Sequence, residues 1–313
     1  GESVLDELVC GEPLGALVLG LVDFSGIVEL PPDCLGDNCA QLLLDASHGL
    51  RPYSTSAEAC RSVRGTSGRA CVTIQVPWHG ILAITMSDQV QLAETLRVLG
   101  VRAVEAAADV LRDRFGASDL RISTKGSPAD VVTDADLTSE RIVRDVLLAE
   151  RPSDGMLAEE GTSIEGISGI SWVLDPIDST ANFARGIPIW SISLAAMDSD
   201  RVLAGVVAFP PGNEVISAAA EAGVLLNGSP VSLGPPPTLS GSMVAIGWGP
   251  RSAGRRQGRV AESLIHRVGK VRSPGSPALG LAWTALGRFD AAYYEMDFND
   301  WDIAAGAVRC ASA

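Results

Sequence analysis

Four short apolar runs, rich in β-branched residues and alanine, follow one another in the middle of this chain of 313 residues. They read SWVLDPID, ISLAAM, VLAGVVAF and EVISAAA, and they lie between residues 171 and 220. Runs of this length and composition at this spacing are typical of the strands of a β-meander. The chain is therefore expected to build a sheet from strands that are neighbours in the sequence.

Patterns typical of helices lie before and after these runs. Ser87 is suited to cap a helix, and apolar residues then recur at steps of three and four as far as about Phe115. A polar turn at 126–128 leads into a short strand and a second helix, which Arg151 and Pro152 end. Further helices are expected at 260–268, 277–286 and 301–309, with a strand at 291–296. The fold class that this order predicts is α/β (α+β).

The chain changes character near residue 87. The preceding part mixes short β-rich runs with turn-rich pieces such as LPPDCLGDN, and it holds five of the six cysteines. The cysteine spacings match no zinc site, so we interpret them as reduced thiols, which favours the cytoplasm. We expect a small N-terminal α/β segment of unknown type at 1–86 and the main domain at 87–313.

The charge and the apolar content exclude two classes of partner. The net charge is −14, so the chain would on average repel the phosphate backbone of a nucleic acid. The longest apolar candidate, LGALVLGLV at 14–22, is too short and too rich in glycine to span a bilayer, and no basic stretch precedes it. We therefore expect neither a nucleic acid nor a membrane as a partner.

Acidic residues gather at the ends of predicted elements in four places. These are Asp130, Asp134 and Asp136; Glu159 and Glu160; Asp175 and Asp178; and Asp300 and Asp302. Carboxylates that lie together repel one another unless a cation or a raised pKa compensates. Ligand sets made only of oxygen suit Mg²⁺ or Mn²⁺. The four groups therefore indicate a site for a divalent cation.

The residues around Asp175 and Asp178 also predict an anion site. Pro176 stiffens the backbone between Asp175 and Asp178, so both carboxylates can point into one small volume. Ser179 and Thr180 then start a predicted helix, whose first N–H groups are free to bind an anion. Metal ions beside an anion site are what the hydrolysis of a phosphate ester requires.

The stretch WVLDPIDSTANFAR at 172–185 resembles the signature of the inositol monophosphatase family, the Mg²⁺-dependent, lithium-sensitive phosphatases of sugar phosphates. WDIAAG at 301–306 is similar to the start of the family's second signature, and KGSPADVVTDAD, AEEG, GVLLNG and DAAYYEMDFNDWD follow the family's order. The resemblance covers roughly residues 88–310. It implies a layered αβαβα sandwich of the inositol monophosphatase and fructose-bisphosphatase type, and a homodimer.

The resemblance also implies roles for individual residues. Two or three Mg²⁺ ions are expected per site, with Mn²⁺ as an alternative. Their ligands would be Glu159, Asp175 and the Ile177 carbonyl for the first ion, Asp175, Asp178 and Asp302 for the second, and Glu159 with waters for a weaker third. The catalytic residues would be Thr180, paired with Asp136, together with Glu159. The substrate would contact Asp178, Ser179, Thr180, Gly275, Ser276 and Glu295, with Lys125 and Asp130 in supporting positions.

Two features depart from the family's pattern. Arg309 replaces an aliphatic residue, and the sequence stops at Ala313, where the family continues into further strand and helix. The main domain is therefore expected to be short at its C-terminus. Pro277 stands where the family commonly offers a backbone N–H, which proline lacks.

The leading prediction is the Mg²⁺-dependent hydrolysis of a small phosphate monoester, first of all inositol monophosphate, by a metal-activated water. Histidinol phosphate and fructose bisphosphate are alternative substrates within the same chemistry. An alternative of another class is a non-catalytic regulatory or binding protein on a phosphatase scaffold, with residues 1–86 as its interaction module.

Overall fold

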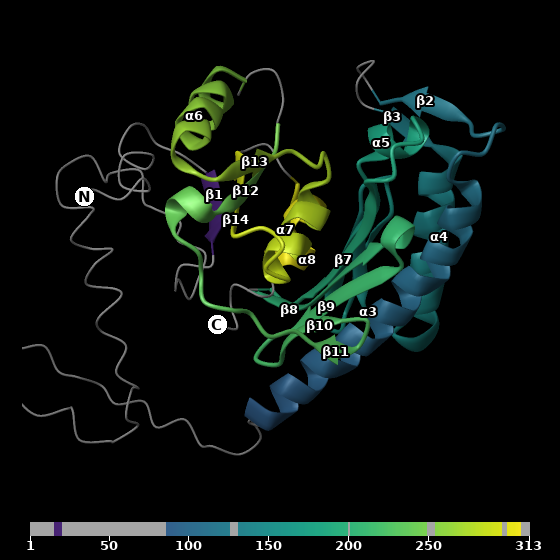
Figure 1. Cartoon of the computed structure of the whole chain (residues 1–313). Coiled ribbons are helices and arrows are strands. Elements are labelled where there is room, and N and C mark those ends of the chain that lie inside the picture. Colours follow the sequence, from purple (N-terminus) through teal and green to yellow (C-terminus); the bar gives the residue numbers. More distant parts are fainter. Residues whose placement is uncertain are drawn as a thin grey trace, which may run out of the picture.

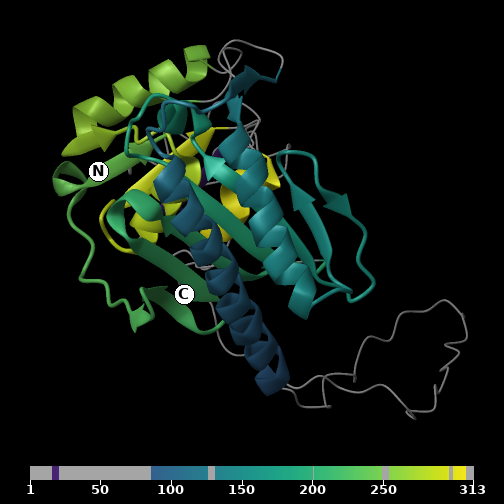
Figure 2. The same cartoon turned by 90° about the vertical axis from the view of Figure 1, so that its right-hand side faces the viewer.

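The fold consists of alternating layers of helices and sheets (Figure 1). The computed structural model describes residues 16–20, 86–125, 131–199, 201–248, 254–295 and 299–307. Helices α3 (Met86–Arg114) and α4 (Asp134–Glu150) form the first layer and pack side by side on one face of a large sheet (Figure 2). A short hairpin of β2 (Ile122–Thr124) and β3 (Val131–Thr133) connects these two helices.

The large sheet has eight strands in the order β11-β10-β9-β8-β7-β6-β4-β5. Their bounds are β4 (Gly155–Ala158), β5 (Ser163–Ile164), β6 (Ser171–Asp178), β7 (Ser191–Met197), β8 (Val202–Phe209), β9 (Glu214–Ala219), β10 (Gly223–Leu226) and β11 (Ser229–Pro230). The four apolar runs form β6 to β9, and each pairs antiparallel with the next. The expected meander is confirmed. Strand β4 lies parallel to β6, so both strands end at the same edge of the sheet.

A second, smaller sheet lies beyond two further helices. It has the order β1-β14-β12-β13, with β1 (Ala16–Gly20), β12 (Met243–Ile246), β13 (Lys270–Arg272) and β14 (Ala291–Glu295). Helices α7 (Pro277–Ala285) and α8 (Asp300–Ala307) pack between the two sheets, and α6 (Gly254–Arg267) covers the outer face of the small one. Helix α5 (Thr180–Ala184) follows β6, and short 3₁₀ turns lie at 210–212 and 239–241. The expected αβαβα sandwich is confirmed.

The core between α3 and the large sheet explains why this helix forms. Its buried residues Leu96, Leu99, Ala103, Ala107 and Leu111 recur at steps of three and four and make one apolar face. Near the helix C-terminus, the ring of Phe115 lies 5.6 Å from those of Phe183 and Trp190. This aromatic contact fixes α5 against the end of α3.

The predictions about the two ends of the chain remain predictions. Strand β1 pairs antiparallel with β14, and it is the described part of residues 1–85. A domain boundary at 86/87 and a shortened C-terminus remain predictions, and all six cysteines lie outside the described ranges. In the described part of the chain, no helix is both long enough and apolar enough to cross a membrane.

Glycine is required at position 280, where α7 packs against the small sheet. A Cβ on Gly280 would overlap the Tyr294 hydroxyl, and one on Gly247 would overlap the same ring. We expect Gly280→Ala to lower the free energy of unfolding by about 1–3 kcal/mol through overpacking. The matched control is Gly258→Ala on α6, where the new methyl group meets nothing within 4 Å. The Gly258→Ala substitution should raise the free energy of unfolding by about 0.5–1 kcal/mol. Urea denaturation measures both, and a Gly280→Ala variant as stable as the parent would contradict the packing.

Candidate active site

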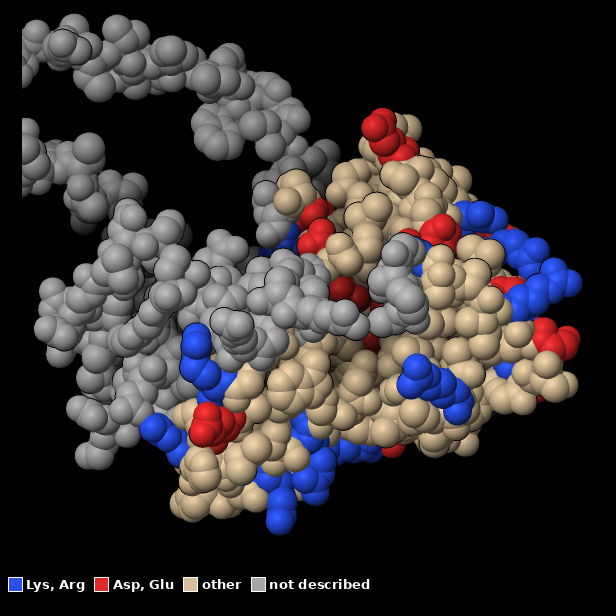
Figure 3. Space-filling model, turned by 90° about the horizontal axis from the view of Figure 1, so that it is seen from above, with Lys and Arg blue, Asp and Glu red and all other residues tan. Residues whose placement is uncertain are grey.

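The acidic residues that the sequence singled out come together where β4 and β6 end. Asp175 and Asp178 close β6, and Glu159 follows the parallel strand β4. Asp302 lies in the first turn of α8, which packs across β6, β7 and β8. Figure 3 looks onto this end of the molecule and shows acidic side chains deep in a hollow near its centre.

Asp178 is held by hydrogen bonds to one of its two oxygens. Its Oδ2 accepts from the Ser276 hydroxyl, from the Ala278 N–H at 2.9 Å and from the Ser191 hydroxyl at 3.2 Å. Burial raises the pKa of Asp178 to about 7; the Ser276 hydrogen bond opposes this shift, and the charge of Asp302 adds to it. The side chain is therefore fixed in direction although its charge is disfavoured.

Asp175 and Asp302 are held in the same way. Asp175 Oδ1 accepts from the Ile177 N–H at 3.0 Å, and Asp302 Oδ2 accepts from the Asn299 N–H at 2.8 Å. Burial raises the pKa of Asp175 well above its usual range, and the charge of Glu159 adds to the shift. Burial also raises the pKa of Asp302 to about 6 against the Asn299 hydrogen bond. These carboxylates thus repel one another across a shared volume.

The chemistry of this cluster fits a hard divalent cation. In each of the three aspartates, the backbone and hydroxyl donors described above bond a single carboxylate oxygen. Within the described ranges no three Asp, Glu, His or Cys side chains already stand close enough to hold a metal ion together. Carboxylates can repel one another at distances that are too long for them to share a metal ion. Mg²⁺ also keeps several of its waters and binds few carboxylates directly. The all-oxygen donors and their mutual repulsion therefore suit Mg²⁺, with modest movement of the side chains.

Thr180 and Asp136 form a buried pair beside the cluster. The Thr180 hydroxyl lies 3.0 Å from Asp136 Oδ1 and also 3.0 Å from the Ile177 carbonyl oxygen. Asp136 Oδ2 accepts from the N–H and the hydroxyl of Thr133, the residue that caps α4. Burial raises the pKa of Asp136 to about 6, although the hydrogen bonds from Thr133 and Thr180 lower it. The structure thus brings together Thr180, Asp136 and the Ile177 carbonyl, which were predicted from the sequence to lie in one site.

Lys125 supplies a positive charge at the edge of the cluster. Its Nζ lies 2.9 Å from Glu159 Oε1 and 2.6 Å from Glu160 Oε1. Burial would lower the pKa of Lys125, but the hydrogen bonds that its ammonium group donates to Glu160 and Glu159 raise it above its usual value. Burial raises the pKa of Glu160 to about 7 in spite of this ion pair. Asp130, the other predicted supporting residue, lies outside the described residues.

The predicted substrate loop lies next to the start of α5. Gly275 has φ +87°, and a Cβ there would lie 3.1 Å from Asn182 Nδ2 and 3.7 Å from Ser179 Oγ. The Ser276 side chain is fully buried, and its hydroxyl is directed at Asp178. Asn182 Nδ2 donates to the carbonyls of Ile189 and Pro274, at 2.7 and 3.3 Å, and ties α5 to this loop. The Glu295 side chain is outside the described part of the chain, although its backbone ends β14.

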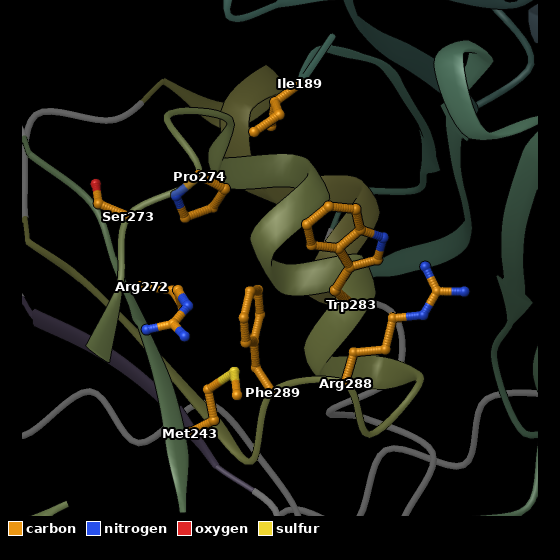
Figure 4. A pocket seen from close by; sticks show the side chains of 8 residues that line it. All are labelled: Ile189, Met243, Arg272, Ser273, Pro274, Trp283, Arg288 and Phe289. Atoms are coloured by element: carbon orange, nitrogen blue, oxygen red, sulfur yellow. The ribbon is translucent and has the colours of Figure 1, made fainter. Parts of the chain in front are cut away.

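An apolar pocket of about 460 Å³ lies next to Ser273 and Pro274, the two residues that precede Gly275 (Figure 4). Its lining consists of Ile189, Met243, Arg272, Ser273, Pro274, Trp283, Arg288 and Phe289. Arg288 is paired with Glu214 at 2.6 Å, and its guanidinium lies 5.8 Å from the centre of the Trp283 ring. None of the acidic residues predicted for the site lines this pocket, so it is distinct from the candidate metal site.

Two buried serines that hold the cluster, Ser191 and Ser139, were not predicted from the sequence. Ser191 stands opposite Asp178 in the register of β6 and β7 and bonds both Asp178 and Ser276. Ser139 donates to the Pro176 carbonyl at 3.0 Å. A signal for Ser139 existed, because it is a polar residue in the apolar face of a predicted helix. Ser191 had none, because its role depends on strand register.

Comparisons with known proteins show which sequences this chain is similar to. The sequence profile of the Inositol monophosphatase family matches residues 92–311. The inositol-1-monophosphatase of Rhizobium meliloti is 38% identical over 217 residues, covering 68% of this chain and 80% of that protein. The inositol-1-monophosphatase SuhB of Mycobacterium tuberculosis is 39% identical over 215 residues, covering 64% and 72%. The Nus factor SuhB of Xylella fastidiosa is 32% identical over 210 residues, covering 66% and 76%.

Solved structures show the same fold. The extragenic suppressor protein suhB of Bartonella henselae superimposes with a TM-score of 0.67 at 30% identity, covering 70% of this chain and 85% of that one. The IMPase of Thermotoga maritima gives a TM-score of 0.62 at 30% identity, covering 70% and 83%.

Ser179 carries backbone strain that can be tested. It has φ 77° and ψ 55°, in the left-handed region, and its side chain makes no capping hydrogen bond to α5. A residue with a Cβ loses about 1–2 kcal/mol there, whereas glycine loses conformational entropy of about 0.5–1 kcal/mol. We expect Ser179→Gly to raise the free energy of unfolding by about 0.5–1 kcal/mol. Ser179→Ala keeps the strain and should give no gain. Equal stabilities of the two variants in urea denaturation would argue against the strain.

Proposed function

This chain belongs to the inositol monophosphatase family, and we propose that it is a Mg²⁺-dependent phosphatase whose substrate is inositol monophosphate. The observation that carries the proposal is the arrangement of the buried carboxylates of Asp175 and Asp178 and the partly buried Asp302, whose charge acts on both, next to the Thr180–Asp136 pair. Relatives at 38 and 39% identity carry the name inositol-1-monophosphatase. A homodimer, inhibition by lithium and a cytoplasmic location belong to the same proposal.

Mg²⁺ in this site would lower the pKa of a bound water and offset the charge on the leaving oxygen. Glu159, Asp175 and the Ile177 carbonyl are the proposed ligands of one ion, and Asp175, Asp178 and Asp302 those of a second. A weaker third ion would use Glu159 and waters. Asp175 contributes to both main sites, which is consistent with its position between the charges of Glu159 and Asp178.

The chain's own residues would direct the water. The Thr180 hydroxyl has one proton and two acceptors at 3.0 Å. When Thr180 donates to Asp136, its oxygen lone pairs are left to accept a hydrogen bond from the attacking water. Glu159 would take the proton of that water as its oxygen bonds to phosphorus and the ester P–O bond breaks. The alcohol then leaves with a proton from solvent, without a phosphoenzyme.

The substrate would lie between α5 and the small sheet. The first hydrogen bond of α5 runs from the Asn182 N–H to the Ser179 carbonyl, so the preceding N–H groups have no partner within the helix. We propose that the N–H groups of Ser179 and Thr180 hold the phosphate, that Gly275 lies over it, and that Glu295 receives hydroxyl groups of the polyol.

A substrate panel tests the proposal. We expect phosphate release from inositol monophosphate with Mg²⁺, loss of release without Mg²⁺, and inhibition by Li⁺. Release from histidinol phosphate or fructose bisphosphate, but not from inositol monophosphate, would move the substrate to the alternative while keeping the reaction.

A function of another class has one observation in its favour. Several relatives at 32–33% identity are named Nus factor SuhB rather than phosphatase. The corresponding proposal is a regulatory or binding role on the same scaffold. Absence of phosphate release from every ester in the panel, together with binding of a protein partner, would favour this role.

The second metal position is tested by Asp178→Asn. The amide oxygen can still accept from Ser276, Ala278 and Ser191, so the fold should be retained. Loss of one negative charge beside the developing charge of the transition state should lower kcat by about 100-fold or more. The matched control is Asp145→Asn on α4, whose side chain is 61% exposed. Steady-state phosphate release compares the two, and near-parental activity of Asp178→Asn would show that Asp178 is not a metal ligand.

Magnesium is expected to stabilise the folded chain. Without a cation, burial disfavours the charged forms of Asp175, Asp178 and Asp302, and neighbouring carboxylates add to this effect, so the pKa of each is raised. An ion that binds only the folded state raises the free energy of unfolding by about 2.7 kcal/mol when its concentration is 100 times its dissociation constant. Thermal unfolding with MgCl₂, and with NaCl at matched ionic strength, measures the gain. A melting temperature that rises equally in both salts would contradict a specific site.

A further inference from the structure

The face of α4 that packs into the protein carries polar side chains among its apolar ones. Asp136, Ser139 and Glu140 are 0, 0 and 6% exposed, although Val143 and Leu147 continue the same face as ordinary core residues. Polar groups are costly to bury unless they are hydrogen-bonded. Their hydrogen-bond partners therefore explain why they stand on this face.

Each of these side chains holds a different segment of the candidate site. Asp136 accepts from Thr180 at the start of α5, and Ser139 donates to the carbonyl of Pro176 between the two aspartates of β6. Glu140 lies one helical turn after Asp136 and contacts the turn that follows β4, where Glu159 is located. One helix thus fixes the three segments relative to one another.

The contact made by Glu140 uses both carboxylate oxygens. Its Oε2 accepts from the Glu160 N–H at 3.0 Å, and its Oε1 accepts from the Thr162 N–H at 3.1 Å and from the Thr162 hydroxyl. A carboxylate accepts at every one of these positions, whereas an amide would present a donor to one of them. The requirement at position 140 is therefore for an acceptor on both sides, not only for a polar side chain.

The turn that Glu140 binds contains Glu159 and sets the direction of its side chain. The Ala158 N–H closes it onto the Thr162 carbonyl at 2.8 Å, and the Glu159 N–H bonds the Leu174 carbonyl of β6 at 3.1 Å. Those bonds fix the near end of the turn to the sheet. Glu140 fixes the far end at residues 160 and 162, so both ends of the segment that carries Glu159 are set.

We propose that Glu140 is a positioning residue for Glu159: it holds the turn after β4 in the conformation that directs the Glu159 carboxylate at the metal and the attacking water. This inference rests on the proposed phosphatase function. Glu140 touches neither metal nor substrate, and it acts through the backbone of Glu160 and Thr162.

The test is Glu140→Gln in the full chain. The amide oxygen can keep the Thr162 bonds, but the NH₂ group then faces the Glu160 N–H, donor against donor. Groups that orient metal ligands typically contribute 10- to 100-fold, so we expect kcat to fall by about 10- to 100-fold. The Mg²⁺ concentration for half-maximal activity should rise by about the same factor, with KM for the phosphate ester near its parental value. Hydrogen exchange at the Glu160 amide should become about tenfold faster.

The matched control is Glu150→Gln on the same helix, whose side chain is 46% exposed and pairs with Arg102 at 2.5 Å. It should leave kcat, the Mg²⁺ dependence and the Glu160 exchange rate unchanged. Parental Mg²⁺ dependence and Glu160 exchange in Glu140→Gln would overturn the proposal. So would a loss of activity that matches the loss of folded protein, because a purely structural role predicts that result.

A second variant decides the case if Glu140→Gln does not fold. Thr162→Val removes one hydroxyl donor and keeps the shape and the Thr162 N–H bond; it should raise the half-maximal Mg²⁺ concentration by a smaller factor, about threefold. An unchanged Mg²⁺ dependence in this variant would overturn the proposal. Glu160 exchange and the Mg²⁺-dependent rise in melting temperature need no substrate. These two measurements therefore test the positioning role of Glu140 even if the chain hydrolyses none of the esters.

Discussion

Carboxylates lie close together where β4 and β6 end and α8 begins, and the repulsion among them is the constraint on which the rest of the site depends. Asp175 and Asp178 are 2 and 3% exposed, and the charge of Asp302 adds to the effect of burial in raising the pKa of both. A fold keeps such groups together only when donors or cations compensate. The surrounding serine hydroxyls and backbone N–H groups compensate in part, and they leave oxygen atoms for a cation. Under the proposed function, a metal ion would complete this compensation.

This compensation draws on parts of the chain that are far apart in sequence. Ser191 reaches Asp178 across the β6–β7 register, and Ser276 reaches it from the N-cap of α7. Asp302 arrives on α8, which packs between the two sheets. The layered sandwich is therefore what makes the site, because only its middle helix layer brings the C-terminal third of the chain to the end of β6.

Helix α4 gives the site its internal alignment. Its buried polar face holds α5, the Pro176 carbonyl and the turn after β4 at once. Catalytic groups lose rate steeply when they shift by an ångström, so a rigid element that fixes several segments is a natural support. The capping box at Thr133 and Asp136 starts the helix at that point, so the same carboxylate both begins α4 and holds Thr180.

The sequence by itself determined the family, the strands of the meander, the main helices and the acidic residues of the site. Those features depend on local periodicity, on turn residues and on a long contiguous motif, all of which are written in neighbouring positions. Only the tertiary structure decided that Ser191 and Ser276 hold Asp178, that Ser139 and Glu140 support the site from behind, and that the Ser276 hydroxyl turns toward Asp178. Strand register and helix packing join residues as much as 98 positions apart, and nothing in local spacing encodes which of them will meet.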